Sequence, residues 1–319
     1  MLALKKQMSF ELERFGATEN SIETLFIGGG TPSTVAPELY APLFALLQPY
    51  LQKGCEITSE ANPNSATYEW LEGMKELGVN RISFGVQSFN TEKLKLLNRA
   101  HTPQMAKDAL LNAEKIGYKN LSLDLIYATL GDTKELLQND IETAFTLPIN
   151  HLSAYALTIE EGTAFEYKPQ MSSEQLSLTS WIFETIESHG FKQYEISNFG
   201  SYESAHNKGY WLYKEYMGVG AGAVGKLGLT RFYPTPIIEE YIKNPLKIKE
   251  ECLELEDKKI EQIFLGMRSS IGVTQSLLSP SELKQAKMLV EEKKLLINKG
   301  RFYNPDYLLA DEITLFLTT

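Results

Sequence analysis

The protein has 319 residues, of which 43% are hydrophobic, enough to bury one large domain and a smaller appendage. Its 31 basic and 41 acidic residues give a net charge of −10, which argues against bulk nucleic-acid binding and against an anionic membrane surface. No apolar run is long enough to span a membrane and no signal-peptide pattern opens the sequence, so we expect a cytoplasmic protein that is not an integral membrane protein.

The chain opens on a predicted amphipathic helix over residues 1–15, with no capping residue before it, so it looks like a chain entered inside a helix. Residues 24–27 are a short apolar run of β-formers and predict a buried strand. Three glycines follow at residues 28–30, and Pro32 then ends regular pairing. Consecutive glycines indicate either a tight turn or a ligand that touches the main chain. A dinucleotide fold is a poor alternative because the G-x-G-x-x-G pattern is absent.

From residue 37 to residue 159, predicted helices and strands alternate. The expected helices span residues 37–52, 65–77, 91–97, 102–117 and 132–145, with Ser65, Thr102 and Asp132 as N-caps, and the expected strands span residues 56–60, 81–89, 121–128 and 151–159. Equivalent points recur every 27 to 37 residues, which is the size of a βα repeat that builds parallel strands. A barrel of parallel strands places its site at the C-terminal ends of the strands.

Polar residues occur where that rule places a site. Residues 28–30, Glu60 and Gln87 lie at or just past successive strand ends, and Asp124 lies inside an apolar strand, where an unpaired carboxylate is costly. Any one of them is also compatible with a hydrogen-bonded polar group of the core. Their convergence on one rim favours a binding site.

Beyond residue 162 the pattern changes. A helix is expected over residues 173–188 and a strand over residues 192–199. Residues 217–223 carry glycine at alternate positions, which suits either a flat ligand, a neighbouring strand or simple turn chemistry. The last 70 residues predict two helices and a hairpin about residues 298–300, similar to a winged helix. From Pro245 onward there are 11 basic and 12 acidic residues, which gives little support for DNA binding.

Several motifs occur together in this sequence. They are G-G-G-T-P at residues 28–32, T-S-E-A-N-P at 58–63, S-F-G-V-Q-S-F at 83–89, N-R-A-H at 98–101, S-L-D-L-I-Y at 122–127, and Y-E-I-S-N-F at 194–199. With residues 151–165, they resemble the radical S-adenosylmethionine (radical SAM) proteins of the oxygen-independent coproporphyrinogen III oxidase family. The motif H-N-x-x-Y-W at residues 206–211 looks like the signature of the HemW branch, the haem chaperones.

The resemblance implies an α/β fold, an incomplete (β/α) radical-SAM barrel over residues 1–200. A connecting region over residues 201–250 and a C-terminal, mostly helical, winged-helix-like HemN-type domain over residues 251–319 would follow. It also implies a set of residues that hold S-adenosylmethionine, namely Gly29, Gly30, Thr31, Glu60, Gln87, Arg99 and Asp124. Main-chain carbonyls at the glycine turn suit the methionine ammonium, Arg99 its carboxylate, and Glu60 or Asp124 the ribose hydroxyls.

Two departures from the family pattern stand out. The Cys-x-x-x-Cys-x-x-Cys loop that holds the 4Fe-4S cluster is absent, so the first barrel strand and that loop are expected to be missing. Cys55 and Cys252 are the only cysteines, and we expect both to be reduced core thiols without a metal. The family's Gly-Leu-Pro-Gly after the Asp124 strand is Ala-Thr-Leu-Gly at residues 128–131, which affects the far side of the adenosylmethionine pocket.

The resemblance favours a HemW-like haem chaperone that binds haem and S-adenosylmethionine and delivers haem to a haem-accepting protein. The alternatives are an oxygen-independent coproporphyrinogen III oxidase of porphyrin biosynthesis, or a cluster-less protein that only binds a ligand or partner. His206 is the candidate haem-binding residue, since a neutral imidazole nitrogen can ligate haem iron. The alternative for His206 is an imidazole satisfied by turn backbone.

Overall fold

The computed structural model describes residues 1–159, 162, 165–173 and 176–319, which divide into two compact units. The first unit comprises residues 1–23, 42–54 and 204–319, and the second comprises residues 24–41 and 55–203. The three-part division with boundaries at residues 200 and 250 stays a prediction. No helix among the described residues is long and apolar enough to cross a membrane.

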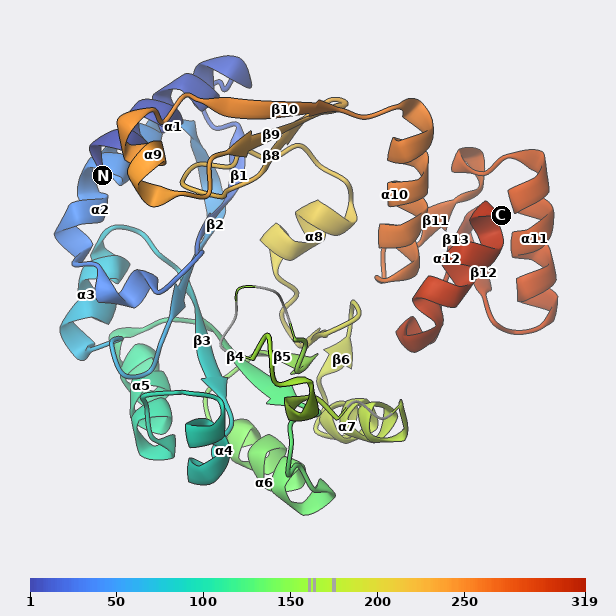
Figure 1. The fold of residues 1–319 in the computed structure, drawn as a ribbon, viewed down its shortest axis with the longest axis horizontal. Helices are drawn as coiled ribbons and strands as arrows, with labels where there is room; N and C mark the ends of the chain where they lie inside the picture. The colour runs from blue at the N-terminus through green and yellow to red at the C-terminus, as the bar shows by residue number, and fades with distance from the viewer. Residues whose placement is uncertain (160–161, 163–164, 174–175) are drawn as a thin grey trace. The chain divides into compact units, whose positions relative to one another are not determined.

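The second unit is built on a seven-stranded sheet with the order β1-β2-β3-β4-β5-β7-β6 (Figure 1). The strands are β1 (Ile22–Ile27), β2 (Leu51–Ala61), β3 (Arg81–Gln87), β4 (Asn120–Tyr127), β5 (His151–Ala156), β6 (Lys192–Gln193) and β7 (Asn198–Gly200). Strands β2 to β5 pair in parallel, whereas β7 runs antiparallel to both β5 and β6. This central parallel sheet confirms the predicted α/β fold.

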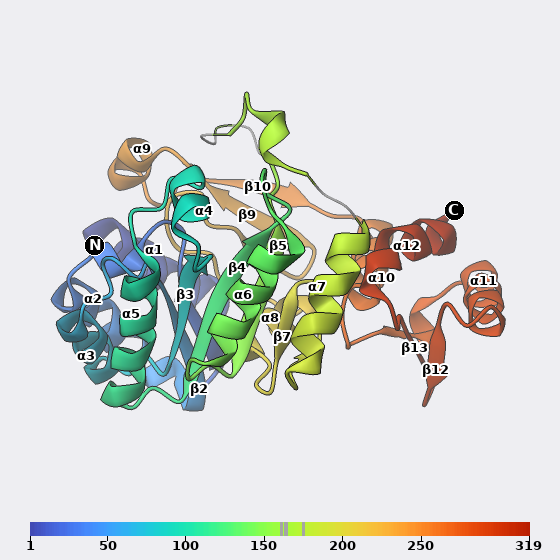
Figure 2. The same ribbon diagram turned by 90° about the horizontal axis from the view of Figure 1, so that it is seen from below.

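Helices cover one face of this sheet. The helices are α3 (Tyr68–Glu76), α4 (Thr91–Leu96), α5 (Pro103–Ile116), α6 (Lys134–Phe145) and α7 (Leu176–Ser188), and Figure 2 shows α5, α6 and α7 side by side along the strands. Leu121, Leu123 and Leu125 of β4 are buried. Because side chains alternate between the two faces of a strand, Ser122 and Asp124 of β4 point to the opposite face.

Two predicted helix caps are wrong. The cap of α5 is Thr102, as predicted, but α3 is capped by Thr67 and α6 by Thr133, and each threonine side chain accepts a backbone N–H. The predicted caps have other partners: the Ser65 hydroxyl lies 2.6 Å from that of Ser33, and Asp132 makes an ion pair. Neighbouring residues of similar capping strength therefore compete, and tertiary contacts decide between them.

Two predicted element boundaries also differ. The helix expected over residues 37–52 ends earlier, since α2 spans Pro37–Leu47, a 3₁₀ turn follows at Gln48–Tyr50, and β2 begins at Leu51. Pro49 lies inside this turn, where it interrupts the helical hydrogen bonds. The strand expected over residues 192–199 is two short antiparallel strands, β6 and β7, joined by a tight bend. The bend is stabilised by the Gln193 side chain, which donates to the Ile196 carbonyl.

The first unit begins with α1 (Leu2–Arg14) and continues after residue 204 with α8 (Ala205–Trp211), α9 (Ile238–Lys243) and a three-stranded antiparallel sheet. The strands of this sheet are β8 (Gly225–Leu227), β9 (Thr230–Pro234) and β10 (Ile248–Cys252). Polar Gln7 and Glu11 are buried in α1 beside Leu12, so its inner face is less apolar than predicted.

Gln7 explains part of the glycine-rich stretch at residues 217–223. The Gln7 amide donates to the Gly218 carbonyl at 3.0 Å and accepts the Gly220 N–H at 2.9 Å. A Cβ on Gly218 would lie 2.2 Å from the Val224 carbonyl oxygen, which no side chain permits. These contacts favour the structural explanation of this stretch.

The C-terminal part of the first unit has its own apolar core (Figure 1). This C-terminal part consists of α10 (Leu255–Met267), β11 (Val273–Thr274), α11 (Pro280–Glu291), β12 (Leu296–Asn298), β13 (Arg301–Tyr303) and α12 (Ala310–Thr318). Strands β12 and β13 form the predicted hairpin. Cys252, at the end of β10, is exposed, so the expectation of a core thiol is wrong there, whereas Cys55 is buried.

Candidate functional site

The glycine turn after β1 combines close packing with open space. A Cβ on Gly28 would lie 2.7 Å from Phe26 Cε1 and 2.9 Å from Glu60 Oε2, so only glycine fits there without displacing a neighbour. Gly29 and Gly30 have φ angles of +76° and +135°, which favour glycine. Apart from the chain neighbours of each glycine, no heavy atom of the described residues lies within 4 Å of a Cβ built on either. The turn therefore exposes main chain beside a carboxylate.

Glu60 lies at the end of β2, directly behind this turn. Burial raises the pKa of the Glu60 carboxyl. The Gly29 N–H donates a hydrogen bond to this carboxyl and lowers its pKa by a smaller amount. The turn and the loop after β2 are tied together: Asn62 Nδ2 donates to Thr31 Oγ1 at 3.3 Å, and the Asn62 N–H donates to the Ser33 hydroxyl at 2.9 Å. The ends of β1 and β2 therefore bring Gly29, Thr31 and Glu60 close together.

Gln87 ends β3 in an uncommon conformation. Its φ is +67°, and the pairing of β3 with β4 shifts register between Phe84 and Gln87. A Cβ on Gly85 would lie 3.0 Å from Gln87 Nε2 and 3.3 Å from Asn62 Oδ1. The Gln87 amide therefore folds over Gly85 toward the loop that follows Glu60.

Asp124 and Arg99 complete the predicted set. The Ser83 hydroxyl approaches Asp124 Oδ1 at 3.4 Å, and the Ser153 hydroxyl also donates to this carboxylate. Burial is the largest cause that raises the pKa of Asp124, to about 6, and the nearby Glu60 carboxylate acts in the same direction. Arg99 is half-buried and its pKa is lowered by burial, while attraction to Asp124 opposes that change. The Arg99 guanidinium has no ion-pair partner within the part of the chain that the structure describes.

A third side of the site was missed by reasoning on residue types. Ser153 of β5 lies opposite Asp124 on one side and opposite Asn198 of β7 on the other, so the three share one face of the sheet. Tyr155 also points to this face and hydrogen-bonds to Ser153 and Asn198. Glu195 accepts the Ser197 N–H at 3.1 Å and bonds to Asn198. The sequence signals were residues 151–165 and the Y-E-I-S-N-F motif, both read through resemblance alone.

Glu195 makes the stability of the protein depend on pH. Burial raises its pKa from 4.5 to about 7, so the native state holds a proton that the unfolded chain releases. The contribution of Glu195 to the free energy of unfolding is fully present below about pH 4.5. It decreases by about 3 kcal/mol as the pH rises through 7. Glu195→Gln should therefore melt higher than the wild type at pH 8 and near it at pH 5. Exposed Glu135→Gln is the control, and an equal difference at both pH values would contradict this prediction.

The H-N-x-x-Y-W motif lies in the first unit, where it forms α8. The Ser204 hydroxyl caps this helix by accepting the Asn207 N–H. His206 and Tyr210 are one turn apart on one face, with Nε2 and the hydroxyl at 3.2 Å and the rings at 5.0 Å, edge to face. The Tyr210 ring also meets Tyr216 at 4.8 Å and is 40% exposed. An imidazole and an exposed aromatic ring therefore share this surface.

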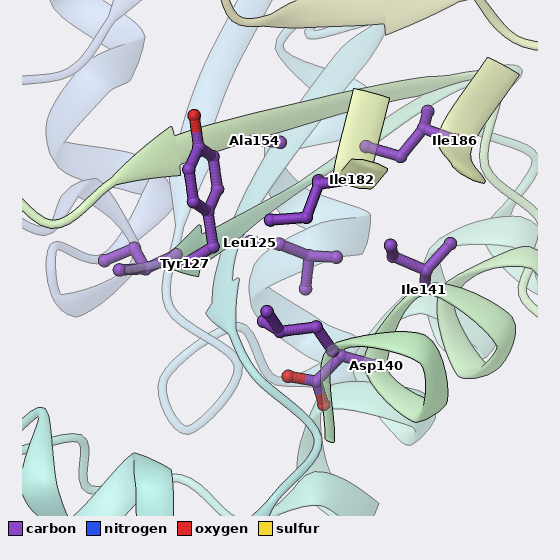
Figure 3. A pocket seen from close by; sticks show the side chains of 9 residues that line it. Leu125, Tyr127, Asp140, Ile141, Ala154, Ile182 and Ile186 are labelled. Carbon is purple, nitrogen blue, oxygen red and sulfur yellow. The ribbon is translucent and has the colours of Figure 1, made fainter. Parts of the chain in front are cut away.

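A small pocket on the other side of the sheet is not part of this site. Leu125, Tyr127 and Ala154 line it from the strands, and Ile141, Ile182 and Ile186 from α6 and α7 (Figure 3). Its walls are apolar except for Asp140, and the side chains of Asp124 and Ser153 point to the opposite face. The pocket belongs to the helix-covered core.

The residues of the second unit fit S-adenosylmethionine. Arg99 offers a cation, without an ion-pair partner among the described residues, for a carboxylate. The exposed main chain at Gly29 and Gly30 offers carbonyls for an ammonium, and Glu60 and Asp124 offer acceptors for hydroxyls. A three-cysteine cluster site does not fit the two cysteines of the printed sequence. Within the described residues, no group of three His, Cys, Asp or Glu side chains is arranged to hold a metal ion.

Comparison with known proteins gives consistent matches. A profile of the Radical SAM superfamily matches residues 7–144. A Lactococcus lactis protein named "Heme chaperone HemW" is 32% identical over 316 residues, which cover 94% of this chain and 82% of that protein. A Bacillus subtilis protein of the same name is 33% identical over 291 residues, which cover 86% and 76% of the two chains.

Among solved structures, coproporphyrinogen III oxidase (HemN) from Escherichia coli, described as a radical SAM enzyme, has a similar fold. The TM-score is 0.80 at 19% identity, over 99% of this chain and 82% of that chain. At this identity the likeness concerns the fold alone.

Proposed function

The chain belongs to the HemW family of radical SAM proteins, and we propose that it is a haem chaperone, which binds haem and S-adenosylmethionine and delivers haem to a partner protein. The observation that carries this proposal is the 32% identity to a protein named "Heme chaperone HemW" over 82% of its length. The acceptor in this proposal is a protein that requires haem. Since HemN shares only the fold, its oxidase activity is not extended to this chain.

The proposed adenosylmethionine site consists of Gly29, Gly30, Thr31, Glu60, Gln87, Arg99 and Asp124. S-adenosylmethionine would supply a radical precursor only together with a reducing cluster, so for this chain we propose its binding and not its cleavage. In this chain, Arg99 would pair with its carboxylate, and carbonyls of the glycine turn would accept from its ammonium. Glu60 and Asp124 would accept from ribose hydroxyls, and ionised carboxylates do so more strongly, so binding should weaken as the pH falls below about 6.

Haem is the cargo in this proposal, and α8 is its proposed contact. His206 supplies an imidazole, and the exposed Tyr210 ring on the same helical face offers an apolar surface for a porphyrin. Both cysteines are unpaired thiols, in keeping with the reducing cytoplasm that we propose for this protein.

Titration with haemin tests this proposal. We expect His206→Ala to bind haemin more weakly than the wild type and to change the position of the Soret band, because an axial nitrogen is lost. The matched control is His189→Ala, since His189 is exposed, stacks on Phe145 and does not belong to α8. Identical Soret spectra and affinities for His206→Ala and wild type would exclude ligation by His206.

The printed chain should hold no iron–sulfur cluster. After anaerobic reconstitution with iron and sulfide we expect no stable 4Fe-4S absorption and no release of 5′-deoxyadenosine on reduction. The reason is that only Cys55 and Cys252 are available, one buried and one exposed. About four irons per chain together with 5′-deoxyadenosine release would refute this expectation.

A further inference from the structure

Three residues in or next to the proposed adenosylmethionine site adopt a left-handed backbone conformation, which residues other than glycine rarely adopt. Gln87, Asn98 and Ala128 have φ angles of +67°, +53° and +59°. Gln87 ends β3, Asn98 precedes Arg99, and Ala128 follows β4, the strand of Asp124. Such residues cost free energy, and they persist only where the surrounding structure holds them in place.

A buried charged cluster contacts the chain just after two of these bends and includes a residue of the helix that leads to the third. Lys93 Nζ of α4 lies 2.8 Å from Asp132 Oδ1, and the two side chains are 3% and 1% exposed. The angle at this contact is not that of a hydrogen bond, so the attraction is that of an ion pair. Asp140 of α6 is close enough that the Lys93 charge lowers its pKa, against a larger increase from burial. We call Lys93, Asp132 and Asp140 the ion-pair cluster.

Asp140 fixes the chain that leaves Gln87. Its carboxylate accepts the Ser88 hydroxyl at 2.6 Å and the Phe89 N–H at 2.7 Å. The side chain starts on α6 beside the apolar pocket, and its carboxylate points away from the apolar residues (Figure 3). The residues directly after the Gln87 bend are therefore held by an acceptor from another element.

Asp132 and Lys93 connect the other two bends. Asp132 Oδ2 accepts the Thr129 N–H at 2.9 Å, directly after Ala128. Lys93 begins the turn of α4 that leads to Asn98 and Arg99, and the Leu97 N–H bonds to its carbonyl. The cluster thus joins the loop after β3, the loop after β4 and the helix before Arg99.

From these contacts we infer that Lys93, Asp132 and Asp140 are positioning residues, which hold the bends at Gln87, Asn98 and Ala128 and so place Gln87, Arg99 and Asp124 around the ligand. The inference rests on the proposed adenosylmethionine site. A buried ion pair is a weak source of stability, since desolvation offsets its attraction, but it does fix the elements that it joins. Its replacement by apolar residues should therefore affect ligand binding more than folding.

The test compares the wild type with the double variant Lys93→Met/Asp132→Leu, which removes both members of the ion pair together. Asp140 loses the nearby Lys93 charge but keeps its hydrogen bonds from Ser88 and Phe89. We expect a melting temperature within a few degrees of the wild type, at least fivefold weaker binding of S-adenosylmethionine by calorimetry, and faster hydrogen exchange of Phe89 and Thr129. Lys95→Met/Glu92→Gln, an exposed ion pair on the same helix, is the control and should change none of these.

Adding Ala128→Gly to the double variant tests the mechanism further. Glycine adopts the left-handed conformation without steric cost, so this third change should restore part of the lost affinity. If the double variant fails to fold, Asp140→Asn, which keeps a carbonyl acceptor, should give the same direction of change in binding and exchange. Wild-type affinity together with wild-type exchange in the folded variants would overturn the inference. Lack of binding by the wild type would overturn the proposed site instead, and the exchange rates would still test the cluster.

Discussion

Replacement of Arg99 by alanine is expected to weaken S-adenosylmethionine binding at least tenfold. Arg99 is half-buried, and its guanidinium is attracted by the Asp124 carboxylate. It has no ion-pair partner among the described residues. A charge-assisted contact of this kind contributes about 1.5–3 kcal/mol, which corresponds to tenfold or more in the dissociation constant. Isothermal titration calorimetry at pH 7.5 measures the difference.

Lys95→Ala is the matched control for this variant. Lys95 is a cation of α4, four residues before Arg99, but its side chain is 67% exposed and pairs with Glu92. Its loss should leave the affinity unchanged, because an exposed ion pair contributes little. An Arg99→Ala variant that binds as tightly as Lys95→Ala would show that Arg99 is a structural surface residue.

Gly28→Ala is expected to have a comparable effect from a single methyl group. The added Cβ would lie 2.9 Å from Glu60 Oε2 and 2.7 Å from Phe26, so the Glu60 carboxylate must move away from the Gly29 N–H. This disturbs the carboxylate and the exposed main chain together, and we expect at least tenfold weaker binding of S-adenosylmethionine.

Gly209→Ala is the control for the glycine variant. It lies in α8, where the nearest atom to an added Cβ is Lys214 Cδ at 4.0 Å, and alanine favours a helix. It should bind S-adenosylmethionine like the wild type. Equal affinities for Gly28→Ala and Gly209→Ala would mean that the packing of Gly28 on Glu60 has no role in the site.

The positions of the candidate site residues followed from local patterns. Glycine at residues 28–30 and the polar residues Glu60 and Gln87 were predicted at strand ends, and the structure places them there. Asp124 was recognised as a carboxylate inside an apolar strand, and it lies on the sheet face opposite the buried leucines. These features depend on neighbours in the chain and on strand periodicity, which a sequence displays directly. Their role in holding S-adenosylmethionine stays a prediction.

The features that were missed depend on contacts between distant residues. Asp132 and Thr133 are both good N-caps, and only the buried Lys93 of another helix shows that Asp132 is used elsewhere. Glu195 lies in a bend that the alternating pattern of residues 192–199 predicted as a strand. Glu195 bonds to Asn198, only three residues away, and the antiparallel pairing of β7 with β5 then places Asn198 opposite Ser153, beside Asp124. No local pattern predicts that pairing.

Haem chaperone function requires that this chain takes up haem as a specific cargo. The most direct measurement is a spectroscopic titration of the purified wild-type chain with haemin, followed by gel filtration and determination of haem per chain. We expect a saturable Soret shift and one haem retained per chain. A featureless, non-saturating titration, with no haem retained after gel filtration, would contradict this expectation.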